Sequence, residues 1–385
     1  MAKQPETPRP IGYGRQTIGL EDVEGVVRVL GSERLTQGAA VEGFEGRLSA
    51  FTGARHAVAV SNGTVALELA YLALDVGPGT RVATTANTFL ATATTAVRLG
   101  AEVEFVDVEP ESGNLDVEEL AALCAGPNPP DVVTVVHFAG LPCDMQSVLA
   151  LKRTHGFRLV EDAAHALGAT YRADGRSWRV GEHPDVDATT LSFHPVKLIT
   201  TGEGGAVLTH HEEVAARVGR LREHGVDRRV EGLSYAPMVE LGTNGRLNDL
   251  SAALGISQLG RAPEFLAARR DIARRYLEQL EDYLLPSSGT QETHAWHLFF
   301  VRVEADERDA LRAHLRGQEI HTQVHYHPVP LQPWFLAHTK GGHWPNAEAH
   351  GKCALSLPIH PSMEEGDQAR VLDALRDWRR ARRAA

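Results

Sequence analysis

Short apolar runs alternate with amphipathic stretches through the first half of the chain. β-branched residues dominate the runs, and apolar residues recur at helical spacing in the stretches. The pattern predicts strands at 56–60, 81–85, 103–108, 132–137 and 158–161, and helices after Leu20 and at 64–74, 89–99, 117–123 and 145–154. Short strands separated by helices predict an α/β fold with a mostly parallel central sheet covered by helices on both faces.

From Leu247 onward, strands no longer alternate regularly with helices. The order of the elements expected there predicts a smaller C-terminal α+β domain. We expect residues 1–255 to hold an extended N-terminal arm and the large domain, and residues 256–385 the small domain. The tail at 379–385 is expected to be disordered. The elements expected in this half are helices at 247–259 and 263–284, a strand at 296–303, a helix at 307–315, a strand at 322–325 and a final helix at 365–380.

Length, charge and cysteine content limit the class of protein. A chain of 385 residues is long enough for two hydrophobic cores. Its net charge of −11 argues against a nucleic-acid partner, since nucleic-acid binders carry a basic face. No apolar run approaches the roughly 20 residues that a membrane span needs. Three separate cysteines suit a reducing cytoplasm, and the 19 histidines show no metal-ligand spacing, so we expect a cytoplasmic protein without a metal.

One lysine lies between two apolar runs, 188–191 and 206–208, on a segment that ends in the Gly-rich stretch 202–205. On a tight connection between two strands, Lys197 cannot move freely. Schiff-base chemistry needs such a fixed, partly desolvated amine, because its pKa falls enough for it to attack a carbonyl. A surface hairpin with an exposed lysine is the alternative interpretation.

Three polar segments fall at strand ends, where ligands bind in open parallel sheets. Residues 61–64 lie between a strand and a helix, where Gly63 and free backbone N–H groups suit a phosphate. Residues 161–166 place Asp162 where it can pair with a protonated ring nitrogen of a cofactor. Residues 241–249 also suit an anion. An ordinary capping turn is the alternative at each of these places.

A lysine, a strand-end acid, a phosphate cradle and a second lobe together describe a pyridoxal 5′-phosphate (PLP) enzyme. Over nearly its whole length the chain resembles the DegT/StrS-type sugar aminotransferases, which have the type I fold of PLP enzymes. The lysine run with its Gly-Glu-Gly-Gly exit is highly specific. The likeness rests on residues 13–16, 35–38, 61–64, 136–140, 161–166, 192–205, 296–298 and 324–326.

The resemblance implies a role for each matching residue. Lys197 is the catalytic lysine, which forms the Schiff base with PLP and moves the proton. Asp162 keeps the pyridine nitrogen of the cofactor protonated. Because one matching residue reaches the cofactor from the neighbouring subunit, a homodimer with a composite active site is implied. The remaining cofactor contacts are Gly63, Thr64 and Ser192 at the phosphate, His165 at the ring hydroxyl, Phe89 stacked on the ring unless it is simply a core residue, and Asn244 from the other subunit.

The resemblance also implies L-glutamate as amino donor and a nucleotide-linked keto-sugar as acceptor. It is greatest to the branch of the family that aminates C4 of a UDP-linked 4-keto-6-deoxy-N-acetylhexosamine in pseudaminic-acid biosynthesis. Two departures near the expected pocket, Gly245 in place of an aromatic residue and the pair at 86–87, leave the exact sugar open. The candidate substrate contacts are Tyr13, Arg15, Arg34, His325 and Tyr326.

Other activities fit parts of the pattern. Amination at C3 of a dTDP- or GDP-linked keto-sugar stays open. Lys197 speaks against a PLP-dependent sugar dehydratase, which has a histidine at the lysine position. A cofactor-binding regulator would need a DNA-binding module for which the chain has no extra length. A phosphate-loop nucleotidase would need the Gly-x-x-x-x-Gly-Lys-Ser/Thr motif, which is absent because Lys197 precedes the glycines.

Overall fold

The computed structural model describes residues 9–228, 230, 234–280, 283, 293–339 and 341–384. Among them a seven-stranded sheet forms the large domain, in the order β1-β9-β8-β5-β4-β2-β3. All neighbouring strands are parallel except at β9, which pairs antiparallel with β1 and with β8, so the expected mostly parallel sheet is confirmed. The strands are β1 (His56–Val60), β2 (Arg81–Thr85), β3 (Glu102–Val106), β4 (Val132–Val136), β5 (Arg158–Asp162), β8 (Ala188–Ser192) and β9 (Gly205–Thr209).

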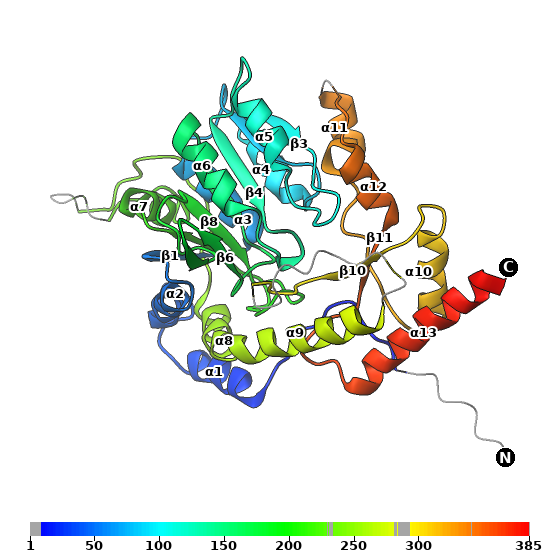
Figure 1. Ribbon diagram of the computed structural model, residues 1–385. Coiled ribbons are helices and arrows are strands. Elements are labelled where there is room, and N and C mark those ends of the chain that lie inside the picture. The colour runs from blue at the N-terminus through cyan, green and yellow to red at the C-terminus, as the bar shows by residue number, and fades with distance from the viewer. Residues whose placement is uncertain are drawn as a thin grey trace.

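Helices cover both faces of this sheet, as Figure 1 shows. The central strand β4 reads Val-Val-Thr-Val-Val and is buried at every position, because it has helices on either side. One core lies under α2 (Ala39–Thr52), α5 (Val117–Cys124), α6 (Met145–His155) and α8 (Asp249–Gly260). The other lies under α3 (Gly63–Ala73), α4 (Leu90–Arg98) and α7 (Glu212–Leu221).

A second lobe follows along α9 (Ala262–Gln279), which runs from the side of α8 toward β10, α10 and α13 (Figure 1). Phe265 and Leu266 of this helix belong to a core of the large domain, whereas Ile272 and Tyr276 belong to that of the second lobe. The two cores therefore meet within α9. The lobe contains the antiparallel pair β10 (Phe299–Arg302) and β11 (Ala354–Leu357), with α10 (Arg308–Gly317) and α13 (Glu365–Ala384).

The described part of the N-terminal arm packs on the second lobe of its own chain. The backbone N–H of Ile11 donates to the carbonyl of Glu319 at 2.8 Å, and that of His321 donates to the carbonyl of Ile11 at 2.8 Å. The Ile11 side chain is buried in the core of the lobe. Contacts distant in sequence thus hold the first described residues in place, while residues 1–8 of the expected arm lie outside the described residues.

Several expected elements differ from the structure. The strand expected at 322–325 is reduced to one bridge, Gln323 to Ser356. The helix expected at 263–284 ends at Gln279, and residues 281, 282 and 284 lie outside the described residues. Disorder of the tail was a wrong expectation through Ala384, because α13 continues to that residue; Ala385 lies outside the described residues. The Arg379 guanidinium stacks over the Tyr283 ring at 4.3 Å and helps hold this last part of the helix.

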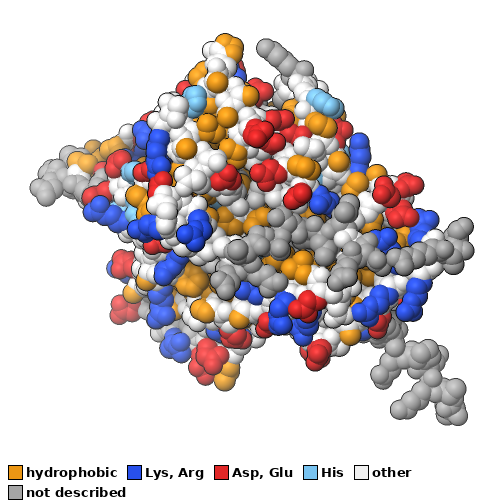
Figure 2. All heavy atoms as spheres, viewed as in Figure 1, with side chains coloured by type: hydrophobic (Ala, Val, Ile, Leu, Met, Phe, Trp, Pro, Cys, Tyr) orange, Lys and Arg blue, Asp and Glu red, His pale blue; other side chains and the backbone are white. Residues whose placement is uncertain are grey.

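The remaining elements are shorter or peripheral. A further hydrophobic cluster packs Phe335 and Ala347, from two helices of the second lobe, against Phe105 of the edge strand β3. No helix in the described ranges is long and apolar enough to cross a membrane. On the face shown in Figure 2, basic and acidic side chains are interspersed rather than separated. The shorter or peripheral elements are α1 (Leu20–Leu30), β6 (Thr170–Ala173), β7 (Arg176–Arg179), α11 (Pro333–His338), α12 (Pro345–Cys353) and the 3₁₀ turns Phe138–Gly140 and Val329–Leu331.

Candidate active site

A cavity of about 800 Å³ opens where the strand ends of the large domain meet the second lobe. Its walls come from the start of α3, the end of β5, the connection after β8 and the segment 323–327. Segments more than 250 residues apart in the chain thus share one cavity. The predicted site residues that line it are Tyr13, Gly63, Thr64, Phe89, Asp162, His165, Ser192, Lys197, His325 and Tyr326.

Lys197 lies on the connection between the antiparallel strands β8 and β9. Tight turns hold this connection, because the Lys197 N–H donates to the His194 carbonyl at 2.8 Å and the Thr201 N–H to the Phe193 carbonyl at 3.0 Å. Burial, reinforced by the charge of Arg269 and opposed by that of Asp162, lowers the pKa of the Lys197 amine to about 8. A substantial fraction of the amine is therefore neutral and nucleophilic near neutral pH.

Asp162 ends β5 and is held by two donors. The Thr92 hydroxyl donates to its Oδ2 at 2.7 Å, and the Ala164 N–H donates to its Oδ1 at 3.2 Å. Thr92 in turn lies 2.8 Å from the Thr88 hydroxyl, and the Tyr71 hydroxyl donates to the Thr92 carbonyl at 2.9 Å. The carboxylate is thus fixed while facing the cavity. Sequence reasoning missed Thr92, although the spacing of Thr88 and Thr92 by one helical turn was a usable signal.

The start of α3 forms a close approach to the β8–β9 connection. The Asn62 side chain caps the helix by accepting from the Val65 N–H at 2.9 Å. A Cβ added at Gly63 would lie 2.9 Å from the Cβ of Ser192, and one added at Gly205 would lie 2.6 Å from the Asn62 carbonyl carbon. Only glycine fits at these two positions. The free N–H groups of the first helical turn and the Ser192 hydroxyl consequently face one small space, which suits a phosphate.

Aromatic rings and imidazoles form the opposite wall. The ring of His165 lies 4.2 Å from that of His297, and its Nε2 is 3.3 Å from the Tyr326 hydroxyl. Burial, with the nearby charge of Lys197, lowers the pKa of His165 and of His325, to about 3 for His325. These imidazoles are therefore neutral at physiological pH. The Nδ1 of His165 is buried without a hydrogen-bond partner in the described part of the chain, so it can meet a ligand atom.

The two departures from the family pattern lie behind the cavity rather than in it. Neither Asn87 nor Gly245 lines the cavity wall. The Asn87 side chain accepts from the Tyr326 N–H at 3.2 Å and so holds that residue in place. Gly245 is buried against α3, where an added Cβ would lie 3.0 Å from the Val65 side chain. Each of the two positions thus contacts a residue of the cavity wall, Tyr326 or Val65, and lies near the pocket as expected.

Not every predicted contact reaches the cavity within a single chain. Phe89 does not belong to the core, because its side chain is 57% exposed and stands at the cavity. Arg15 and Arg34 are exposed and lie outside the cavity. Asn244 is also exposed, and its backbone bridges to Glu223. Their roles in binding stay predictions, as does that of Phe89 in stacking.

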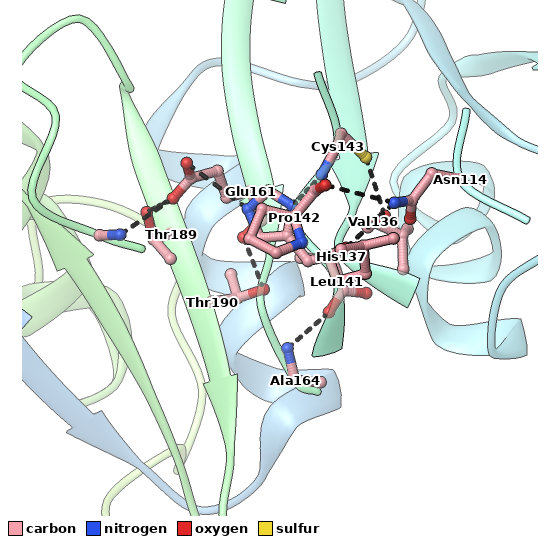
Figure 3. A network of polar contacts seen from close by, with 12 residues as sticks. Asn114, Val136, His137, Leu141, Pro142, Cys143, Glu161, Ala164, Thr189 and Thr190 are labelled. Carbon is pink, nitrogen blue, oxygen red and sulfur yellow. Dashed lines mark hydrogen bonds and ion pairs between the residues drawn. The ribbon is translucent and has the colours of Figure 1, made fainter. Parts of the chain in front are cut away.

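A second carboxylate, Glu161, lies next to Asp162 in the chain and points into the protein. The Thr189 hydroxyl donates to its Oε2 at 2.7 Å and the Gly181 N–H donates at 3.2 Å. His137 approaches from the other side, with its Nε2 3.6 Å from Oε1 (Figure 3). Burial alone would raise the pKa of Glu161, but His137 and Thr189 outweigh it and the pKa is lowered. Sequence reasoning had quoted both residues in motifs without assigning them to this network.

Fold and cavity together define the class of protein: a PLP-dependent transferase of fold type I. Within that class, the chain belongs to the DegT/DnrJ/EryC1/StrS aminotransferase family, which it matches over residues 16–376. It is a sugar aminotransferase. Across 381 residues it is 36% identical to the spore coat polysaccharide biosynthesis protein SpsC of Bacillus subtilis, covering 95% of this chain and 96% of that protein.

Two solved structures extend the comparison. Helicobacter pylori PseC, an aminotransferase involved in pseudaminic-acid biosynthesis, matches with a TM-score of 0.89 at 26% identity, covering 96% of this chain and 99% of PseC. DesV of S. venezuelae, solved in complex with a ketimine intermediate, matches with a TM-score of 0.85 at 35% identity, covering 93% of this chain and 94% of DesV.

The residues present fit PLP. The cradle at Gly63 is a space that a single Cβ would fill, and it has helix N–H donors suited to the phosphate. Asp162 offers a fixed carboxylate to the ring nitrogen, and the unpartnered Nδ1 of His165 is available to a ring substituent. The lowered pKa of Lys197 suits imine formation with the aldehyde. The cofactor therefore matches groups already placed around one cavity.

Proposed function

We propose that this enzyme moves the amino group of L-glutamate to C4 of a UDP-linked 4-keto-6-deoxy-N-acetylhexosamine. The observation that carries the transfer chemistry is the amine of Lys197, with its pKa lowered to about 8, sharing one cavity with Asp162. Support for the sugar comes from the similarity to PseC over 96% of the chain. The wall of neutral imidazoles and tyrosines suits the hydroxyl and keto groups of a sugar.

The proposal assigns tasks to the residues around the cofactor site. Bound PLP would supply the electron sink for charge that develops on the carbon next to nitrogen. Asp162 would hold a proton on the ring nitrogen, since its carboxylate is fixed by Thr92 and faces the cavity. Lys197 would take the α-proton of glutamate and, in the second half-reaction, deliver a proton to the sugar carbon. Gly63, Thr64 and Ser192 would hold the phosphate.

The sugar would bind against the opposite wall. The Nδ1 of His325 lies 2.8 Å from the Ser356 hydroxyl, which orients the imidazole, and the ring of Tyr13 lies 5.6 Å from it. Because His325 is neutral, we assign it to the sugar rather than to the diphosphate. Arg15 and Arg34 are the candidates for the diphosphate, and since both lie outside this chain's cavity, a second subunit would have to bring them there.

A homodimer is part of the proposal. Helix α1 exposes an apolar row, with Leu20, Val23, Val27 and Leu30 between 50% and 69% exposed, which a second copy could cover. Asn244 would then reach the partner's phosphate site. Mixing inactive Lys197→Ala and Asn244→Ala chains tests this arrangement. Because a mixed dimer has one site with both defects and one with neither, exchange should restore about a quarter of wild-type activity. No recovery on mixing would contradict a composite site.

The proposed substrate is tested with a panel of keto-sugar nucleotides. Enzyme, L-glutamate and PLP are incubated with UDP-, dTDP- and GDP-linked 4-keto and 3-keto sugars, and the aminated carbon is identified by mass spectrometry and NMR. We expect amination at C4 of the UDP-linked N-acetylhexosamine. Preferred amination at C3 of a dTDP- or GDP-linked sugar would replace this proposal with its alternative.

The catalytic lysine is tested separately. Lys197→Ala should lose at least about 1,000-fold in turnover, because both the imine partner and the proton carrier are removed. Borohydride should leave a mass adduct on the Lys197 peptide of the wild-type enzyme loaded with PLP. Lys152→Ala is the matched control, since that lysine pairs with Asp187 before the start of β8, whereas Lys197 follows the end of that strand. Near-normal turnover of Lys197→Ala would reject the assignment.

A further inference from the structure

Arg269 is a buried guanidinium whose hydrogen bonds go to backbone carbonyls alone. It lies within α9, where its side chain is 1% exposed. Its Nη1 donates to the carbonyls of Trp296 at 3.2 Å, His297 at 3.1 Å and Ile359 at 2.9 Å. Its Nη2 donates to the carbonyl of Val196 at 3.5 Å. Within the described ranges no carboxylate pairs with it, and its Nε has no partner.

A buried cation without a counter-ion is costly, so this arrangement calls for a reason beyond packing. Each carbonyl that it holds belongs to a segment that shapes the cavity. Val196 directly precedes Lys197, and His297 itself lines the cavity. The Ile359 N–H donates to the carbonyl of Tyr13 at 3.1 Å, so the segment of Ile359 also holds Tyr13, which lines the cavity. One guanidinium therefore connects the lysine-bearing turn of the large domain to two segments of the second lobe.

We propose that Arg269 is a positioning residue for Lys197: it clamps the carbonyl before the lysine to the second lobe and places a positive charge near the amine. The proposal rests on Lys197 being the lysine of the reaction. The planar fork of arginine suits the task, because it reaches several carbonyls at once. Burial lowers the pKa of Arg269 to about 10, which is still above that of Lys197, so the guanidinium is charged over the range in which the amine titrates. Lysine at this position would keep the charge but lose the fork.

The charge acts on an amine that already has several titratable neighbours. Asp162 at the end of β5 favours the protonated amine, whereas Arg269 disfavours it. Three cavity histidines face the same amine: His165 after β5, His297 before β10 and His325 in the segment 323–327. His360 lies near Arg269 itself, and Arg15 adds positive charge there. Burial with these charges leaves all four imidazoles neutral, so Arg269 is the cation whose removal changes the field at Lys197.

The test separates charge from position with two variants. Arg269→Met removes the charge and the donors, and Arg269→Lys removes the fork but keeps the charge. Arg274→Met is the control on the same helix, since Arg274 is half exposed and pairs with Asp271 at 2.8 Å. The first readout uses cofactor-free protein. Trace acetic anhydride labels amines between pH 6 and pH 10, and peptide mass spectrometry gives the pH midpoint for Lys197.

The second readout is the rate at which cofactor-free protein captures PLP, followed by absorbance. It is measured about one pH unit above each protein's own labelling midpoint, where the amine is mostly neutral. At that pH the protonation states are matched, so any remaining difference in rate reports the position of the amine. Thermal unfolding of each variant tests whether the fold is retained.

We expect a wild-type labelling midpoint near 8, as the lowered pKa of Lys197 requires. Arg269→Met should move it upward by about one unit, because a neighbouring positive charge disfavours the protonated amine. Arg269→Lys should leave the midpoint near the wild-type value, and both variants should capture PLP about tenfold more slowly. Arg274→Met should match wild type in both readouts.

An unmoved midpoint in folded Arg269→Met, or wild-type capture by Arg269→Lys, would overturn the proposal. If Arg269→Met does not fold, the capture rate of Arg269→Lys decides alone. Neither readout uses a sugar substrate, so the outcome is independent of the keto-sugar panel. A panel without aminated product would reject the proposed substrate and leave the clamp standing. Absence of labelling or borohydride capture at Lys197 would reject the lysine assignment instead.

Discussion

Glu161 and Asp162 follow one another at the end of β5, and successive side chains of a strand point to opposite faces. Asp162 therefore faces the cavity, where the described residues supply one hydroxyl and one backbone donor. Glu161 faces the interior, where a hydroxyl, a backbone N–H and an imidazole surround it. A carboxylate accepts about four hydrogen bonds, so Asp162 keeps capacity for a ligand.

The difference shows that two adjacent residues at one strand end serve different purposes, one for stability and the other for ligand binding. The Oε2 of the fully buried Glu161 accepts both of its hydrogen bonds from its own chain, and its Oε1 faces His137 at 3.6 Å. Glu161 also links β5 to β8, since Thr189 lies directly opposite it in the parallel register. Asp162 is 6% exposed, and two donors fix its carboxylate without using all of its capacity to accept hydrogen bonds. It can therefore stabilise a cation that binds in the cavity. Stability should therefore depend mainly on the first carboxylate, and turnover mainly on the second.

The largest effect should come from Asp162→Asn. The amide keeps the shape but carries no charge, so the protonated ring nitrogen of the cofactor loses its partner. We expect turnover to fall about 1,000-fold, or ~4 kcal/mol of transition-state stabilisation, with the midpoint of thermal unfolding close to wild type. Steady-state assays and calorimetry on the same preparation check both parts. Turnover within tenfold of wild type would contradict the division of tasks.

The reciprocal variant is Glu161→Gln, which should lose stability rather than turnover. The His137 Nδ1 accepts from the Cys143 N–H at 3.2 Å, so we assign its proton to Nε2, which faces Glu161. A glutamine amide that keeps the Thr189 and Gly181 contacts would turn its NH₂ group toward that N–H, donor against donor. We expect the free energy of unfolding to fall by about 2 kcal/mol.

Denaturant titration measures this loss, and turnover of the folded fraction should stay within about threefold of wild type. Glu182→Gln is a suitable control for the charge change, since that side chain accepts from the exposed Arg179 N–H. A large loss of turnover in Glu161→Gln with unchanged stability would reverse the comparison between the two carboxylates.

A smaller effect is expected from Thr92→Val, which removes the hydroxyl donor to Asp162 and keeps the volume. The hydrogen bond to a charged group is worth about 1.5 kcal/mol, so turnover should fall about tenfold as the carboxylate becomes less fixed. Thr95→Val, on the same helix, is the matched control because its hydroxyl donates to the Ala91 carbonyl alone. Equal losses in both variants would show general damage to α4 rather than a role at Asp162.

The smallest effect concerns pH. The pKa of Glu161 is lower in the folded protein than in the unfolded chain, so its ionised form contributes stability above the ordinary value near 4.5. That contribution is lost as the pH falls through the folded pKa. The stability difference between wild type and Glu161→Gln should therefore be constant from pH 5 to 7 and shrink below about 4.5. Unfolding titrations at several pH values check the sign; a difference that grows with acid would contradict it.

Local pattern was enough to predict the main frame of this protein. The alternation of β-branched runs with helical stretches predicted the parallel sheet, because burial on both faces requires continuous apolar strands. The run around Lys197 predicted a turn between two strands, since its apolar flanks and glycines are themselves local. Asp162 was predicted as a site residue for the same reason: it lies at the end of a buried strand.

What the tertiary structure alone decided is which distant groups meet. Thr92 reaches Asp162 across 70 residues, Asn87 holds Tyr326 across 239, and Arg269 gathers carbonyls from both domains. The arm joined its own second lobe, and the predicted strand at 322–325 became part of the cavity wall. Periodicity reports the face that one element buries; the partner on that face depends on how all elements pack together, and no local pattern contains it.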